Sequence, residues 1–201
     1  MMPNLDGIEF CNRVKSNINT SHIPFMMLTA KNSEEDIIGG VVSGADFYFT
    51  KPISLELLLL TVHNILEQKE KLKQKYKKDY YVEARELVNN KMDKDFIDSF
   101  IKIIEEQLHN PELNVDYICK RLYIGRTSLF QKIKNISGQS VNEFVRSLRL
   151  KKAAHILSHE PITIAEVADR VGIQSISYFT RAFKKEFGKT PGEFLRDNHI
   201  N

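Results

Sequence analysis

Apolar side chains in the C-terminal third of the chain recur every three to four residues, the spacing of one helix face. The first stripe consists of Val167, Ala168 and Val171, and the second of Phe179, Ala182, Phe183 and Phe187. Thr163 and Glu166 form a capping-box pattern before the first stripe, and Ser175 is a good N-cap for the second. Gly172 permits a sharp turn between them, and Gly188 ends the second helix. The pattern predicts a helix, a tight turn and a second helix.

The outer face of the second predicted helix is polar. At about 100° per residue, Ser177, Arg181 and Lys184 point away from the phenylalanine seam, with Tyr178 beside them. Arginine can donate two hydrogen bonds to guanine, serine can bond several base edges, and lysine suits phosphates. Taken alone, the pattern fits a solvated face of an ordinary helical bundle equally well.

A repeat favours the DNA-binding interpretation. A shift of 50 positions without a gap pairs Leu129 with Phe179, Ile133 with Phe183, Lys134 with Lys184, Gly138 with Gly188, Ser140 with Thr190, Glu143 with Glu193, and Phe144 with Phe194. An inner apolar face, a terminating glycine and a capping box therefore recur in the same order. Two such helices in one chain can enter successive major-groove segments, about 34 Å apart, without dimerisation.

Many positions of the second unit follow one known pattern. They are Ala168-Asp169-Arg170-Val171-Gly172-Ile173, Tyr178-Phe179, Arg181, Phe183-Lys184-Lys185, Gly188-Lys189-Thr190-Pro191 and Phe194. With these residues the segment from about 110 to 197 resembles the DNA-binding domain of the AraC family of bacterial transcription regulators. The resemblance implies an all-α domain of two helix-turn-helix units, joined by a long helix at about residues 142–158.

The same resemblance implies which residues contact DNA. The base-contacting positions match Arg126, Thr127, Phe130 and Gln131 in the first recognition helix, and Ile176, Ser177, Tyr178 and Arg181 in the second. By their place on the outer helix face, Lys184 and Lys185 suit phosphates, and Lys134, the repeat partner of Lys184, is a further candidate DNA contact. Gly125 departs from the family, since many members carry a serine cap there. Glycine caps a helix nearly as well, so the fold is expected to be kept while one phosphate contact is lost.

The first 66 residues alternate between helical and strand patterns. A helix is predicted from Asp6 to Asn17, and a buried parallel strand from Ile23 to Ala30. A second helix is capped by residues 32–35 and ends near Gly44. A short strand covers residues 46–50, and Ser54 opens another helix. This order predicts an α/β, doubly wound sheet.

Four short motifs punctuate this N-terminal segment: Met1-Met2-Pro3-Asn4-Leu5-Asp6-Gly7, Leu28-Thr29-Ala30, Gly44-Ala45-Asp46 and Phe49-Thr50-Lys51-Pro52. With them it resembles the C-terminal half of a response-regulator receiver domain of the CheY type. The resemblance implies that Thr29 is the switch hydroxyl, Tyr48 the switch aromatic and Lys51 the lysine that binds the aspartyl phosphate. A hydroxyl and an ammonium at strand ends can hold a phosphoryl group.

The phosphoacceptor aspartate of receivers would lie just before Met1, and the metal-binding carboxylates earlier still. Neither is present, and Asp6 lies in a loop and is no substitute. The first three strands of a five-stranded sheet are also missing, so we expect an uncovered strand edge and apolar face. A fragment, a start codon assigned too late, or a decayed receiver that dimerises would each account for this. Mg²⁺ is expected only for a complete receiver, and no cofactor is expected in this chain.

Three domains or segments follow from these patterns. Residues 1–66 are the partial receiver, 67–92 a charged linker, and 93–201 the AraC-type domain. Lysines crowd the start of the linker, which favours a solvated helix or linker over a DNA-contacting basic arm or a coiled dimer helix. Residues 93–108 are better patterned, with Phe96, Phe100 and Ile104 on one side, and we expect them to pack on the DNA-binding domain.

Charge divides the chain in the same way. Residues 1–66 carry 4 Lys and Arg against 7 Asp and Glu, whereas residues 111–196 carry 15 against 8. A basic C-terminal half fits a polyanionic partner. Cys11 and Cys119 are too far apart in the sequence for a disulfide framework or a metal motif and are expected to be buried thiols. No membrane-spanning segment, catalytic motif or clustered histidine ligands are found, so we predict neither an enzyme nor a metal site.

Two functions remain from the sequence. The favoured one is a sequence-specific, DNA-binding transcription regulator of a two-component phosphorelay, located in the cytoplasm on the nucleoid. Its expected partners are promoter DNA, RNA polymerase and a sensor kinase domain, which a hybrid sensor would carry in the same chain, and a homodimer through the receiver or linker is a further expectation. The alternative is a signalling adaptor with a decayed receiver and only nonspecific DNA binding.

Overall fold

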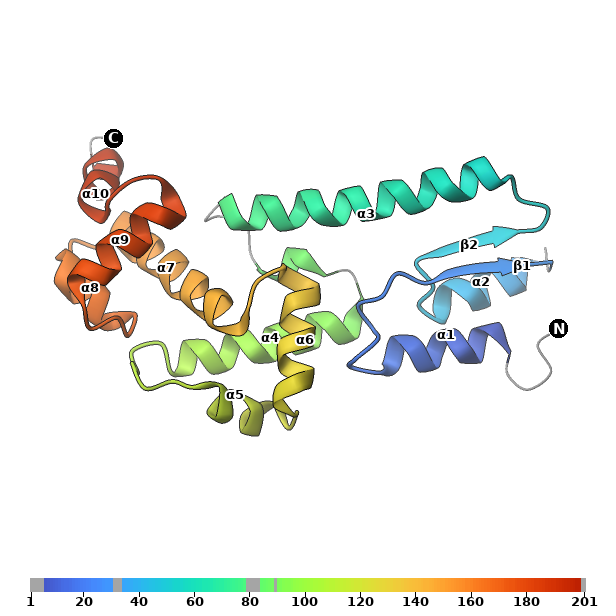
Figure 1. Cartoon of the computed structure of the whole chain (residues 1–201), viewed down its shortest axis with the longest axis horizontal. Helices are drawn as coiled ribbons and strands as arrows, with labels where there is room; N and C mark the ends of the chain where they lie inside the picture. The colour runs from blue at the N-terminus through green and yellow to red at the C-terminus, as the bar shows by residue number, and fades with distance from the viewer. Residues whose placement is uncertain (1–5, 31–33, 79–83, 89, 200–201) are drawn as a thin grey trace. The chain divides into compact units, whose positions relative to one another are not determined.

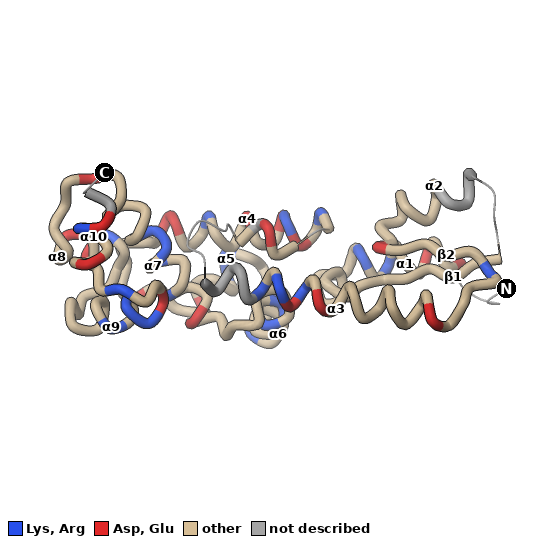
Figure 2. Tube along the Cα trace, turned by 90° about the horizontal axis from the view of Figure 1, so that it is seen from above, with Lys and Arg blue, Asp and Glu red and all other residues tan. Residues whose placement is uncertain are grey.

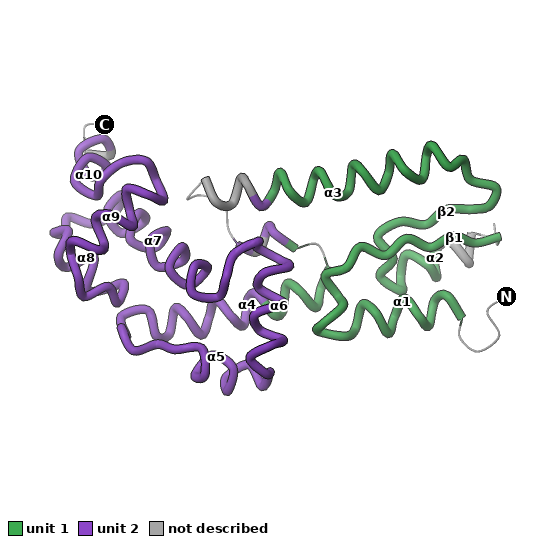
Figure 3. Tube along the Cα trace, viewed as in Figure 1, with its two compact units in different colours: residues 1–72, 88–96 green, residues 73–87, 97–201 purple. Residues whose placement is uncertain are grey.

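The computed structural model describes residues 6–30, 34–78, 84–88 and 90–199 (Figure 1). The chain forms two compact units (Figure 3). The first comprises Met1–Leu72 with Val88–Phe96, and the second Lys73–Leu87 with Ile97–Asn201. The first is α/β and the second helical, which confirms the predicted fold class.

The first unit has a parallel pair of strands with helices between and after them. Its helices are α1 Gly7–Ser16, α2 Glu34–Val42 and, as far as Leu72, α3 Leu55–Lys78, and its strands are β1 Met26–Thr29 and β2 Phe47–Thr50. Met26 lies opposite Phe47, and Thr29 lies opposite Thr50. α2 is the crossover between the strands, so the predicted βαβ order is confirmed. The capping residues predicted at 32–33 and the loop at 1–5 lie outside the described residues.

The parallel strand predicted from Ile23 to Ala30 is present, but it is shorter and less buried than expected. β1 begins only at Met26, after Pro24, which lacks a backbone N–H. Met27 is buried, but Leu28 is 41% exposed. A parallel strand is buried when helices and further strands cover it, and β2 is the one strand that pairs with β1 within the described part of the sheet. Apolar side chains also remain exposed on α2 and α3, among them Val42 and Leu55.

Lys15 and Asp46 connect α1 to the segments just before the two strands. The Lys15 ammonium lies 2.6 Å from Asp46 Oδ2 and donates to the Ile23 carbonyl at 2.8 Å. The same Asp46 oxygen accepts the Phe25 amide at 2.6 Å. The Lys15 side chain is only 8% exposed, so the pair satisfies a charge that burial would otherwise penalise.

The charged segment after residue 66 begins as helix. α3 starts with Leu57 N–H donating to Ser54 Oγ, as predicted, and it continues without a break to Lys78. A short 3-10 helix, η1, covers Ala84–Leu87, and α4 covers Lys91–Glu106. The Phe100 ring of α4 packs on Phe144, with centroids 5.7 Å apart. From Ile97 onward α4 packs with the DNA-binding domain as expected, whereas its start, up to Phe96, belongs to the first unit.

The second unit places its helices in the predicted order. They are α5 Val115–Leu122, α6 Arg126–Ser137, α7 Val141–His159, α8 Ile164–Arg170, α9 Ile176–Phe187 and α10 Pro191–His199. Capping boxes start α7 at Ser140 and α8 at Thr163. Gly138 and Gly188 end α6 and α9 in the left-handed conformation. Each predicted cap is therefore confirmed, because side-chain oxygens and positive-φ glycines satisfy the end groups of helices.

Aromatic rings fill the core of the second helix-turn-helix unit. Phe183 is fully buried, and its ring centroid lies 5.7 Å from that of Phe179, 4.6 Å from Phe187 and 5.4 Å from Phe194. These contacts join α9 to α10. The buried face of α9 is the predicted one, which leaves its opposite face for solvent.

Candidate nucleic-acid interface

The outer faces of α6 and α9 are exposed at every position proposed to contact DNA. On α6 these are Arg126, Thr127, Phe130, Gln131 and Lys134, and on α9 they are Ile176, Ser177, Tyr178, Arg181 and Lys184. Phe130, Ile176 and Tyr178 are 41%, 50% and 42% exposed. Large apolar groups on a soluble surface cost hydration free energy unless a partner covers them. Their position beside arginines suits contact with thymine methyl groups and sugars.

Packing and capping orient α9. Ser175 accepts the Tyr178 amide at its N-cap, and Phe179 and Phe183 are fully buried beneath the helix. The turn before it contains Gly172, with φ of +68°. The Arg181 Nε donates to the Ser177 carbonyl at 3.3 Å, and the side chain is exposed. Basic residues occur on both α6 and α9 (Figure 2).

The start of α6 differs from that of α9. Gly125 is its N-cap and makes no side-chain hydrogen bond, as the sequence predicts. Arg126 follows and makes a two-pronged ion pair with Asp116 of α5: Nε lies 2.6 Å from Oδ1, and Nη2 2.8 Å from Oδ2. The hydrogen bond that Arg126 donates to Asp116, together with the negative charge of Asp116, raises the pKa of Arg126. A residue proposed to read a base is therefore already paired in the free protein.

Lys134 is also engaged, because its ammonium donates to the Gly138 carbonyl at 3.0 Å. This carbonyl lies just beyond the C-terminus of α6, where a cation is favourable. Both groups are at the surface, so DNA can compete for the lysine. Sequence reasoning treated Lys134 as a candidate DNA contact and missed this second role.

Tyr123 is an exposed residue that sequence reasoning missed. It adopts φ of +55° at the end of α5 and is 95% exposed. It is the one non-glycine residue with positive φ in the described part of the chain. The hydrogen bonds of the two turns match Tyr123 with Gly172, since each amide donates to the carbonyl three residues earlier. The ungapped shift of 50 positions pairs Tyr123 with Ile173 instead and so conceals this match.

The receiver residues lie at the carboxyl ends of the two strands. Thr29 ends β1, and Lys51, joined to Pro52 by a cis peptide, follows β2; the Lys51 amide donates to the Thr29 carbonyl at 2.7 Å. The Tyr48 ring packs so closely on α2 that a Cβ at Gly40 would lie 2.4 Å from it. The backbones of Thr29 and Lys51 meet at this edge, and the roles of their hydroxyl and ammonium toward a phosphoryl group stay a prediction.

Neither a metal centre nor a membrane span is found in the described residues. They contain no group of three or more histidine, cysteine or acidic side chains placed to hold a cation. Of Thr29 and Lys51, the lysine carries an ammonium without a free lone pair and cannot ligate Mg²⁺. No described helix is long and apolar enough to cross a bilayer. Cys11 and Cys119 are free and buried, as expected.

Comparison with known proteins identifies both parts. Residues 118–197 match the family described as helix-turn-helix domain, and residues 1–63 match the response regulator receiver domain. Histidine kinase P4 of Formosa agariphila is 34% identical over 194 residues, which are 96% of this chain but 14% of that protein. The HTH-type transcriptional regulator MtrA of Neisseria gonorrhoeae is 32% identical over 97 residues, which are 47% of this chain and 32% of MtrA.

The chain thus spans less than a third of the length of these two relatives. A transcriptional regulator with an AraC-type DNA-binding domain from Chromobacterium violaceum has the same fold. It is 20% identical with a TM-score of 0.50, and the match covers 54% of this chain and 96% of that one. Residues 118–197 are therefore similar to helix-turn-helix domains, and residues 1–63 are similar to response regulator receiver domains.

Proposed function

We propose that this chain is the DNA-binding output end of a two-component transcription regulator, and that it reads two successive major-groove segments with α6 and α9. The observation that carries the proposal is the matched design of these helices. Each buries an apolar seam, Leu129 with Ile133 in α6 and Phe179 with Phe183 in α9, and exposes the opposite, partly basic face. Two exposed recognition faces in one compact unit suit a bipartite site without a dimer.

The residues of each face have distinct proposed roles. Arg126, Thr127, Phe130 and Gln131 contact bases from α6, and Ile176, Ser177, Tyr178 and Arg181 contact bases from α9, while Lys134 and Lys184 contact phosphates. The exposed apolar groups among them suit thymine methyls, and the arginines suit guanine. A transcription regulator also implies RNA polymerase as a partner, and a homodimer through the receiver or linker would double the number of half-sites.

The receiver segment suits regulation by phosphorylation in the complete protein. Thr29 and Lys51 meet at the carboxyl ends of parallel strands, the edge at which ligands bind in open α/β sheets. We propose that they hold the phosphoryl group and that Tyr48 senses it. The match to a histidine kinase over 96% of this chain supports a hybrid protein in which the sensor and this output end share one polypeptide.

Selection of binding sites by the full chain from a random DNA pool tests the DNA-binding proposal. We expect enrichment of two half-sites whose centres lie about 10–11 base pairs apart, bound about 10³-fold or more tightly than random DNA. Gln131→Ala should alter one half-site and Ser177→Ala the other. Only weak, steeply salt-dependent binding with no enriched motif would contradict the proposal and favour the adaptor.

A further inference from the structure

α7 changes hydrophobic core partway along its length. Its first half buries Val141 and Phe144, and the Phe144 ring packs on Phe100 of α4. Its second half, from Leu150 onward, belongs to the core that contains the phenylalanines of α9. The first helix-turn-helix unit therefore packs on one end of this helix and the second unit on the other. Arg149 lies immediately before the change.

The Arg149 guanidinium bridges the two helix-turn-helix units. Its Nη2 donates to the carbonyl of Asn110 at 2.7 Å, in the loop that leads to α5, and its Nη1 donates to the carbonyl of Gly172 at 2.9 Å, in the turn between α8 and α9. Each unit thus contributes one backbone acceptor to the same planar group. Because a guanidinium holds its donors in a rigid fork, the two bonds define the distance and angle between the two loops.

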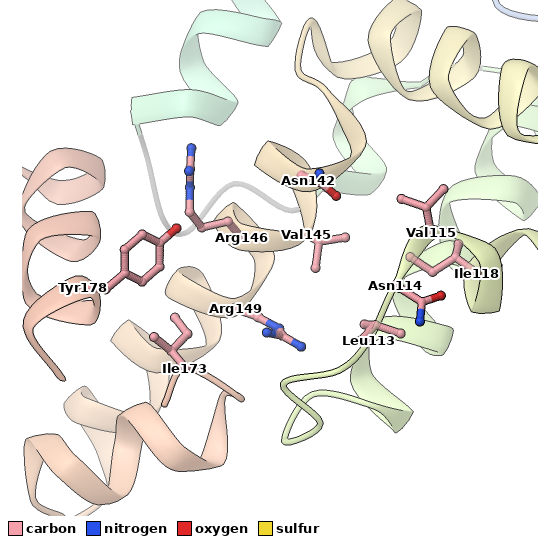
Figure 4. A pocket seen from close by; sticks show the side chains of 10 residues that line it. All are labelled: Leu113, Asn114, Val115, Ile118, Asn142, Val145, Arg146, Arg149, Ile173 and Tyr178. Atoms are coloured by element: carbon pink, nitrogen blue, oxygen red, sulfur yellow. The ribbon is translucent and has the colours of Figure 1, made fainter. Parts of the chain in front are cut away.

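A cavity beside this bridge reduces direct packing between the two helix-turn-helix units (Figure 4). Its volume is about 120 Å³. It is lined by Leu113, Val115 and Ile118 of the first helix-turn-helix unit, by Val145 and Arg149 of α7, and by Ile173 and Tyr178 of the second helix-turn-helix unit. Figure 4 shows Arg149 between the Leu113 side and the Ile173 side. Where side chains leave space between the two helix-turn-helix units, their packing resists rotation of one unit relative to the other only weakly. The polar bridge therefore carries more of the restraint than it would in a filled interface.

Burial makes this an expensive use of an arginine. Its Nε is inaccessible and has no hydrogen-bond partner, and desolvation lowers the pKa of the group. Neither of its two described hydrogen bonds goes to a carboxylate. The adjacent Gly172 also brings the loops unusually close, since a Cβ there would lie 2.5 Å from the Leu108 carbonyl oxygen. Both features restrain the same junction.

We propose that Arg149 is the positioning residue that sets the separation and angle of α6 and α9, and thereby the spacing between half-sites that the protein accepts. Arg149 itself touches no base in this proposal. It acts by holding the Asn110 loop and the Gly172 turn in register. The inference rests on the proposed two-groove reading and assigns its spacing specificity to one guanidinium.

The test is a set of operators in which one base pair is inserted between the half-sites or deleted from between them. Each change moves one half-site by about 3.4 Å and turns it by about 34°. For the wild-type full chain we expect affinity to fall at least tenfold at either altered spacing. For Arg149→Met we expect weaker binding to the optimal operator and less than a threefold difference among the three spacings.

Two matched variants separate this role from others. Arg146→Met removes a neighbouring cavity-lining cation, and should weaken all spacings equally. Ser147→Ala removes a 2.6 Å hydrogen bond from α7 to Glu186 of α9 in the second helix-turn-helix unit. It should leave the dependence of affinity on half-site spacing unchanged. An Arg149→Met protein that binds every operator more weakly but keeps the wild-type profile would overturn the inference. A wild-type protein without any spacing optimum would instead contradict the proposed function.

A second measurement needs no DNA and applies if Arg149→Met does not fold. Spin labels report the distance between the two helix-turn-helix units when they are attached at the exposed Lys120 of α5 and Lys185 of α9. Cys11 and Cys119 are replaced by alanine in the labelled protein. Arg149→Lys keeps the charge but cannot reach both carbonyls as a fork, so we expect its distance distribution to broaden. A distribution as narrow as that of the labelled parent protein would overturn the inference.

Discussion

Arg126 at the start of α6 pairs with Asp116 of α5 through two contacts, of 2.6 Å and 2.8 Å. Both side chains are 61% exposed. Solvent weakens such a pair, so it contributes little to stability. The pair matters for function, because Arg126, the proposed base-reading arginine of the first helix-turn-helix unit, must leave a carboxylate to bind DNA. Arg181 of the second helix-turn-helix unit donates instead to the Ser177 carbonyl of its own helix.

Asp116→Asn should tighten DNA binding, because it removes a competitor for Arg126 and a negative charge near the phosphates. We expect the affinity for the selected operator to rise about twofold to fivefold, the range of an exposed ion pair, measured by fluorescence anisotropy. Glu106→Gln is the control, since it breaks a comparable 2.7 Å pair with Arg121. Weaker binding by Asp116→Asn would show that the carboxylate orients the arginine for DNA.

Arg181→Ala should reduce specific binding by about 1–3 kcal/mol and relax base choice at one position of the operator. The reason is that a guanidinium can make two hydrogen bonds with one guanine. Lys184→Ala on the same face should instead weaken binding to all sequences and lower the salt slope by about one. Repeating the site selection with each variant distinguishes the two residues. A uniform loss for Arg181→Ala would assign it to a phosphate.

Gly172→Ala should destabilise the protein more than Gly188→Ala does. Both positions have positive φ, +68° and +76°, so each alanine costs about 1–2 kcal/mol of backbone strain. A Cβ at Gly188 meets no atom within 4 Å, whereas at Gly172 it would lie 2.5 Å from the Leu108 carbonyl oxygen. Overpacking there adds about 1–3 kcal/mol. Urea unfolding measures both, and equal losses would contradict the close approach of the two loops.

The capping boxes predict a pH dependence of stability. Hydrogen bonds from Ser140, Thr163 and Thr190 lower the pKa of Glu143, Glu166 and Glu193, respectively. Because the pKa is lower in the folded state, the stabilisation is present above the unfolded value of about 4.3 and is lost as the pH falls through the folded values.

The triple variant Glu143→Gln, Glu166→Gln, Glu193→Gln should therefore be less stable than the wild type at pH 6, and its melting temperature should fall less between pH 6 and pH 3.5. Glu105→Gln, at an exposed position on α4, is the control and should keep the wild-type dependence. Thermal unfolding by circular dichroism supplies both profiles. Parallel profiles for the triple variant and the wild type would exclude the capping carboxylates as the cause.

The helices of the DNA-binding unit were predictable because their signals are local. Capping boxes at Thr163 and Ser140, and terminating glycines at 138 and 188, act within one turn of helix. The buried seam of α9 follows from its 3.6-residue period. The same reasoning overestimated the burial of the strand predicted at residues 23–30, because burial of a strand depends on neighbours that lie elsewhere in the fold.

Sequence alone determined the order of elements, the inner and outer faces of α6 and α9, and the family of each half, since all depend on residue type and spacing along the chain. Tertiary structure alone decided that Asp116 holds Arg126, that Lys134 binds the Gly138 carbonyl, and that Arg149 bridges two loops 62 positions apart, at Asn110 and Gly172. These contacts depend on how helices pack in three dimensions. No periodicity along the chain encodes which carbonyl a half-buried guanidinium will reach.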